Sequence, residues 1–253
     1  MQYLLRKQIV ILIAMIGIST SAMSQIDEVY QPNHDELPYY LGMSIGASNS
    51  FLSFQRGVNF LTTPTDAANN IRPLETMYLN LGLTGTLRLS NHFALRTNPT
   101  LLISGNRSTM VYTTNSTDPA ASLPTIYTIP SVIVDIPIGL KIQSDRYTAF
   151  KHPEMMRHYL ITGVKFGFDL GSEKAATLSN GRPYANVFKG SDMAYELGLG
   201  LSFFLRYATI SPEVKFSYGI SDLRKISDSR FPLVSSVEKI NSNFIYFTVH
   251  IEN

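Results

Sequence analysis

The chain has 253 residues, which is enough for one barrel-type domain or two small domains. It contains no cysteine, so neither a disulfide framework nor a lipid-anchored cysteine is available. Lysine and arginine number 21 against 19 aspartates and glutamates, and so small an excess gives no reason to expect nucleic acid as a partner.

The N-terminus has the organisation of a secretory signal. Arg6 and Lys7 precede an apolar run at residues 9–18, and small polar residues follow up to Ser24. The alternative, a membrane anchor, needs about 20 apolar residues. We therefore expect a signal peptide at residues 1–24, cleaved near Ser24, a periplasmic N-terminal segment at 25–38 and a barrel at 39–253. Without Arg6 and Lys7, the mature chain has 21 − 2 = 19 basic residues against 19 acidic ones.

Apolar and polar residues alternate in eight stretches of the mature chain, and no convincing helical period appears. Each stretch has 9 to 13 residues, the length that a tilted strand needs to cross a bilayer. The stretches are Tyr39–Ser48, Tyr78–Leu89, Phe93–Ser104, Val132–Gln143, His158–Leu170, Met193–Phe204, Thr209–Ile220 and Phe244–Glu252.

The connections between these stretches alternate in length. The first, third, fifth and seventh are long and polar, whereas the shortest are the second, at Ser90–His92, and the sixth, at Leu205–Ala208. Transmembrane barrels have short periplasmic turns and long outer loops. Eight strands with both termini on the periplasmic side reproduce this pattern, and a soluble sandwich gives no reason for it.

Residue types indicate which face of each strand points inward. In the sixth stretch, Tyr195, Leu197 and Leu199 share one face, and Glu196, Gly198 and Gly200 share the other. A soluble lipocalin-like barrel would place the apolar face inside, whereas a membrane barrel would reverse this. Nearly all strand glycines lie on the charged face, with Gly85 as the exception. Glycine makes room for long charged neighbours inside a narrow barrel but has no packing role on a solvated surface. We therefore predict an all-β fold, an eight-stranded antiparallel transmembrane β-barrel with a polar lumen filled by side chains.

The predicted lumen contains five cations and four anions that should pair with one another, because unpaired buried charge is costly. They form a structural network and comprise Arg88, Arg96, Asp135, Lys141, Lys165, Asp169, Glu196, Glu213 and Lys215. Pro99, Pro137 and Pro212 each remove a hydrogen-bond donor from a ladder without free edges, and bulges would accommodate them.

No residue pattern in the chain indicates catalysis. The five histidines are scattered without metal-ligand spacing, and no nucleophile-elbow, phosphate-loop or zinc-protease motif occurs. We expect no catalytic residue, cofactor, metal or small-molecule substrate. Two alternatives remain open: a lipid-modifying outer-membrane enzyme, which needs a His/Ser/acid group at the rim, and a soluble periplasmic ligand-binding barrel.

Four segments carry a resemblance to a known family: Phe93–Pro99, Asp135–Lys141, Tyr195–Gly200 and Ser211–Gly219. Over most of its mature length the chain resembles the PorT family, small outer-membrane barrels of Bacteroidetes associated with the type IX secretion system and gliding motility. The family pattern also accounts for the three strand prolines. The resemblance implies an accessory role in protein export and no catalytic residue. Outer-membrane lipid and other secretion-system proteins are the expected partners.

Overall fold

The computed structural model describes residues 30–56, 68–113, 125–150, 152–171, 176–178, 183–184, 189–224 and 237–253. The predicted signal peptide lies outside the described residues. The described residues form one short 3-10 helix, η1 (Pro32–Glu36), and a thirteen-stranded antiparallel sheet. The strands are β1 (Tyr39–Arg56), β2 (Ala68–Leu74), β3 (Thr76–Arg88), β4 (Phe93–Thr97), β5 (Thr100–Thr113), β6 (Thr125–Gln143), β7 (Tyr147–Ala149), β8 (His152–Asp169), β9 (Ala176–Leu178), β10 (Pro183–Tyr184), β11 (Ser191–Phe204), β12 (Thr209–Gly219) and β13 (Val237–Glu252). No helix among them has the length and apolar character needed to span a membrane.

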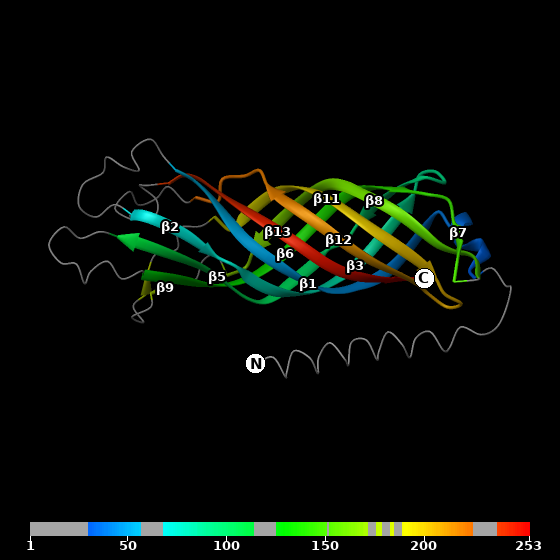
Figure 1. Ribbon diagram of the computed structural model, residues 1–253, viewed down its shortest axis with the longest axis horizontal. Helices are drawn as coiled ribbons and strands as arrows, with labels where there is room; N and C mark the ends of the chain where they lie inside the picture. Colours follow the sequence, from blue (N-terminus) through cyan, green and yellow to red (C-terminus); the bar gives the residue numbers. More distant parts are fainter. Residues whose placement is uncertain are drawn as a thin grey trace.

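The sheet closes on itself as a barrel (Figure 1). The ring runs from β1 through β3, the β4–β5 pair, β6, β8, β11 and β12 to β13, and β13 pairs again with β1. With β4 and β5 counted as one interrupted strand, eight strands form the wall, and each overlaps one of the eight predicted stretches, several of them extending beyond it. The predicted fold class is confirmed.

Two of the connections between the predicted strands, one expected as a long loop and one as a turn, are partly strand. The predicted loop Gly105–Ser131 contains the end of β5 and the beginning of β6, which pair with each other from Gly105↔Ser131 to Val111↔Thr125. The predicted turn Ser144–Arg157 holds β7 and the first residues of β8. Period-two reasoning missed these extensions because their apolar residues do not alternate strictly with polar ones: Met110 and Val111 are consecutive, as are Met155 and Met156.

The short connections 89–92 and 205–208 lie at one end of the barrel, which we call the short-turn end. Figure 1 shows η1, β7 and the C-terminus at this end. The segment before β1 is anchored to it, because the backbone NH of Arg88 donates a hydrogen bond of 2.8 Å to the carbonyl of Pro38.

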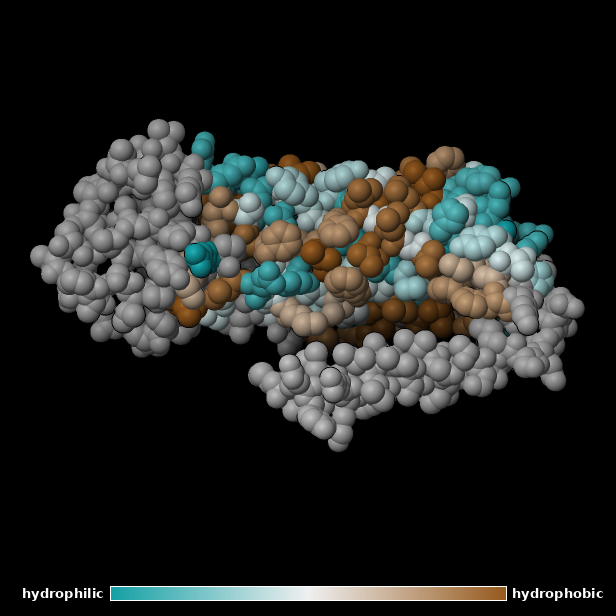
Figure 2. All heavy atoms as spheres, viewed as in Figure 1, coloured by the Kyte–Doolittle hydropathy of each residue, from teal (hydrophilic) through white to brown (hydrophobic). Residues whose placement is uncertain are grey.

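The apolar side chains of the wall point outward. Leu199 at the middle of β11 is 64% exposed, whereas Glu196, whose side chain points to the opposite face, is 4% exposed. Figure 2 shows apolar side chains gathered over the middle of the barrel and hydrophilic ones toward the end that carries β7. Such a belt needs a lipid surface to cover it, since it would leave a large contiguous apolar area in water.

The three strand prolines occupy places where the ladder is interrupted. Pro99 lies in the two-residue break between β4 and β5, and Pro137 lies on β6 opposite this break, between the partners of Thr97 and Thr100. Pro212 is not at a bulge, because the β11–β12 register is the same on both sides of it. The ladder omits its pair, and a 2.9 Å hydrogen bond between the hydroxyls of Ser202 and Ser211 lies beside the gap.

Candidate functional site

The inner faces of the wall strands hold a charged network, because period-two alternation places every second side chain in the lumen. We define the central network as eight buried Asp, Glu, Lys and Arg side chains, each at most 7% exposed, without Arg157, which binds Asp35 at the mouth. Its cations are Arg96, Lys141, Lys165 and Lys215, and its anions are Asp135, Glu196, Glu213 and Glu252. With four of each sign, the network is neutral as a whole, which is what a medium of low dielectric constant requires.

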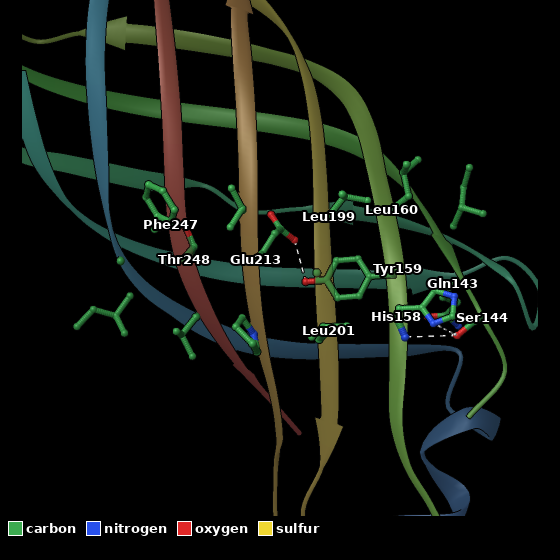
Figure 3. Close-up of a pocket in the computed structure, with 17 residues that line it drawn as sticks. Gln143, Ser144, His158, Tyr159, Leu160, Leu199, Leu201, Glu213, Phe247 and Thr248 are labelled. Carbon is green, nitrogen blue, oxygen red and sulfur yellow. Dashed lines mark hydrogen bonds between the residues drawn. The ribbon is translucent and has the colours of Figure 1, made fainter. Parts of the chain in front are cut away.

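Arg96 on β4 is the hub of the half nearer the short-turn end. Its guanidinium donates hydrogen bonds of 2.8 and 3.0 Å to the two carboxylate oxygens of Glu252 on β13. It also lies 3.3 Å from Glu213 on β12, which accepts a 2.9 Å hydrogen bond from the hydroxyl of Tyr159 on β8 (Figure 3). A single arginine on β4 is therefore tied across the lumen to the neighbouring strands β12 and β13, neither of which pairs with β4.

Two lysines form ion pairs in the other half of the network. Lys165 lies 3.3 Å from Asp135, and the hydroxyl of Tyr246 donates a 2.6 Å hydrogen bond to the same carboxylate. Lys215 pairs with Glu196 at 2.9 Å. A buried cluster of large side chains lies next to these pairs, and its members are Tyr78, Leu102, Ile133, Phe244 and Tyr246.

Lys141 has aromatic partners in place of a direct carboxylate. Its ammonium lies 4.3 Å from the centroid of the Tyr159 ring and 3.5 Å from the hydroxyl of Tyr40. The Tyr159 ring occupies the space that Gly200 leaves, since a Cβ at Gly200 would overlap it. Inward glycines were expected to make room for long charged neighbours, and at this position the neighbour is an aromatic ring instead; Gly85, the predicted exception, has only ordinary contacts.

Seven of the nine predicted network residues lie in the central network, and two do not. Arg88 is at the short-turn rim, where it donates a 2.6 Å hydrogen bond to Asn91. Asp169 lies at the opposite end of β8 and accepts hydrogen bonds from Ser131 and the backbone of Gly171. Both share the inward parity of the network, but strand alternation says nothing of depth along the barrel.

Sequence reasoning omitted Glu252 from the network, although it is the closest partner of Arg96. The signal was present, because Tyr246, Thr248, His250 and Glu252 alternate on the inner face of β13. His250 is fully buried, with Nδ1 2.9 Å from the hydroxyl of Thr84 and Nε2 3.6 Å from Glu213. Thr84 therefore satisfies its Nδ1, while its Nε2 has no hydrogen-bond partner.

The mouth of the lumen at the short-turn end is covered by the segment before β1. Asp35 of η1 accepts two 3.0 Å hydrogen bonds from Arg157 on β8 and lies 2.7 Å from Nε of Arg146. The His34 ring is buried between Tyr40 and Phe204, with centroid distances of 4.6 and 5.4 Å. Burial alone would raise the pKa of the Asp35 carboxyl, but His34, Arg157 and Arg146 together hold that pKa well below its usual range.

The structure brings one serine and one histidine together at the rim. The hydroxyl of Ser144 lies 3.3 Å from Nδ1 of His158, outside the lumen (Figure 3). That hydroxyl donates to the carbonyl of Asp145, and the Asp145 carboxylate pairs with His92 at 3.2 Å. No acidic side chain among the described residues contacts His158, so the dyad lacks the group that would orient its base. The described residues also contain no cluster of three or more metal-ligating side chains.

The large hollow of Figure 3 lies on the apolar belt. Outward-facing side chains such as Leu160, Leu199 and Phe247 line it together with strand backbone. Lipid chains cover such a surface in a membrane barrel, so the hollow is not a site for a polar ligand.

The sequence matches the model of one protein family and resembles several solved structures. The family is described as "Outer membrane protein beta-barrel domain", and the match covers residues 30–225. No curated protein matches the chain.

Among solved structures, Neisserial surface protein A (NspA) has 9% sequence identity and a TM-score of 0.45, covering 85% of this chain and 96% of its own. OprG of Pseudomonas aeruginosa has 12% identity and a TM-score of 0.40, with coverage of 84% and 94%. Ail of Yersinia pestis, in complex with a heparin analogue, has 11% identity and a TM-score of 0.38, with coverage of 86% and 100%.

Proposed function

This chain belongs to the outer-membrane-protein β-barrel domain family, and we propose that it is a non-enzymatic barrel that acts as an accessory component of protein secretion. The observation that carries the proposal is the filled lumen. The central network, the cluster of large side chains and the covered mouth occupy the interior, so contacts made by the ends of the barrel, and not conduction through it, are what it offers to other proteins. The belt indicates a lipid surface around the barrel, and the family is one of outer-membrane proteins.

The secretion route that we propose is of the type IX kind. Its support is the resemblance to the PorT family in the four segments Phe93–Pro99, Asp135–Lys141, Tyr195–Gly200 and Ser211–Gly219. All four lie on wall strands, and they include the central-network residues Arg96, Asp135, Glu196 and Glu213. Because these segments build the lumen, the resemblance supports a barrel interior in common with the PorT family more directly than it supports a partner protein in common.

Deletion of the gene tests the proposal. In the deletion strain, proteins that normally reach the medium should accumulate inside the cell, and complementation with the wild-type gene should restore their export. A Leu199→Met variant serves as matched control, since it keeps the belt apolar and should complement fully. An unchanged set of secreted proteins in the deletion strain would contradict the proposed role.

The lipid-modifying alternative has its own readout. The Ser144–His158 contact places a serine hydroxyl against a histidine ring nitrogen at the rim. If the alternative holds, Ser144→Ala should change the mass of extracted lipid A or phospholipids, whereas we expect the lipid profile to stay the same.

A further inference from the structure

Two arginines at the mouth of the lumen form a cradle that fits a carboxylate. Arg146, in the connection after β6, and Arg157, on β8, have side chains that are 4% and 8% exposed. Their guanidinium carbons lie 3.7 and 5.5 Å from the centroid of the Phe204 ring, which forms the floor of the cradle. Arg157 presents two donors side by side to Asp35, the fork geometry that recognises carboxylates most strongly.

The chain's own segment supplies less negative charge than the cradle can accept. Two buried cations face the single carboxylate of Asp35, and Nε of Arg157 is buried without a hydrogen-bond partner. The carboxylate of Glu154, which also acts on Arg146, is solvent-exposed. Buried cations gain most when their charge is fully matched. A ligand with two neighbouring carboxylates would therefore suit the cradle better than Asp35 does.

The segment that occupies the cradle is separable from the wall. Residues 30–38 form no strand pairing, since β1 begins at Tyr39. Side-chain contacts hold them: Arg146 donates to the carbonyls of Tyr30 and Gln31, and Thr209 donates to the side chain of Gln31. Gln31 has a φ of 50°, a left-handed conformation that costs energy outside glycine. Residues 30–37 can leave the mouth without breaking any hydrogen bond between strands, while the backbone hydrogen bond from Arg88 holds Pro38 against β3.

We propose that the Arg146–Arg157 cradle is a binding site for an acidic segment of a periplasmic partner protein. Asp35 occupies the cradle and blocks this site until the partner displaces it. The proposal rests on the proposed function, which gives the barrel a protein partner, and on an orientation with the short-turn end in the periplasm. Asp35 has the advantage of being tethered, which gives it an effective concentration of about millimolar order. A partner that displaces Asp35 must therefore bind the cradle more tightly than a single carboxylate does, and its additional carboxylates would provide the tighter binding.

The test measures binding of a fluorescent peptide to the full chain in detergent micelles. The probe is a peptide with the sequence of residues 31–38, which contains Asp35 and Glu36, and the matched control peptide carries amides at both positions. We expect the Asp35→Asn protein to bind the acidic probe at least tenfold more tightly than the wild-type protein does. Asp35→Asn combined with Arg157→Gln should lose this binding, and the amide peptide should bind at least tenfold more weakly.

Two results would overturn the proposal. One is that the Asp35→Asn protein binds the acidic and the amide peptide equally well, or binds neither of them. The other is displacement of the probe by inorganic phosphate or by phosphatidylglycerol vesicles at the probe's own concentration, which would mean a general anion site. If the Asp35→Asn protein fails to fold, amide hydrogen exchange of residues 30–38 in the wild-type protein replaces the binding measurement. The acidic peptide at millimolar concentration should accelerate this exchange, and the amide peptide should not. These readouts use purified protein, so they can fail while the secretion phenotype of the deletion strain stands.

Discussion

Replacement of Arg96 by methionine tests whether the central network is a paired plug. Arg96 is 2% exposed and contacts both Glu252 and Glu213. The substitution changes the network from four cations and four anions, a net charge of 4 − 4 = 0, to 3 − 4 = −1. Breaking a buried pair by removal of one partner costs about 3–5 kcal/mol, because an uncompensated charge stays behind. We expect a loss of this size in the free energy of unfolding.

A second substitution separates charge from packing. Arg96→Met combined with Glu252→Gln restores a charge balance of 3 − 3 = 0. The double variant should therefore lose less free energy of unfolding than the sum of the two single losses. We expect the difference, which is the coupling energy of the pair, to be about 1–3 kcal/mol. Arg88→Met at the rim is the matched control, with an expected change within about 0.5 kcal/mol.

Urea unfolding in lipid vesicles provides the measurement. The chain has no tryptophan, so far-ultraviolet circular dichroism and the heat-dependent mobility of the folded barrel on gels replace tryptophan fluorescence. A loss below about 1 kcal/mol for Arg96→Met, together with additive single changes, would refute the reasoning, because it would mean that water and not protein neutralises these charges.

Three further predictions concern the belt, the glycines and the mouth. Leu199→Arg should hinder assembly by placing a charge in lipid at a cost of about 2–4 kcal/mol, whereas Leu199→Met should be nearly silent; equal yields of heat-modifiable barrel would contradict the face assignment. Gly200→Ala should destabilise the barrel because the new Cβ overlaps Tyr159, and Gly85→Ala should not; urea midpoints of the two variants give the comparison. The depressed pKa of Asp35 means that its stabilising contribution is complete above its unfolded pKa of about 3.9 and disappears only as the pH falls through the lower folded value. The protection of the segment before β1 against hydrogen exchange should therefore not depend on Asp35 between pH 7 and pH 5. If the wild-type protein loses protection in that range and the Asp35→Asn protein does not, the depressed pKa of Asp35 would be contradicted.

The sequence by itself determined the eight wall strands and their inward faces, but not the charge balance of the lumen, because it predicted five cations and four anions where the central network has four of each. A strand's side chains alternate with a period of two, so Glu196 and Leu199 reveal their opposite faces without any tertiary information. The lipid covering of the belt follows from the same alternation, since glycine and charge share one face and large apolar residues share the other.

Depth along the barrel and pairing across it were decided only by the tertiary structure. Arg88 and Asp169 share the parity of the network yet lie at opposite rims, because strand tilt and register, which set depth, depend on all eight strands together. The Arg96–Glu252 pair joins residues 156 positions apart, and no local pattern encodes such a contact.

The mouth shows the same limit. Asp35, Arg146 and Arg157 come from a short 3-10 helix, a connection and a strand whose residues look like ordinary polar turns in the sequence. They meet only because closure of the ring brings the segment before β1 and the connection after β6 to the same end of the barrel.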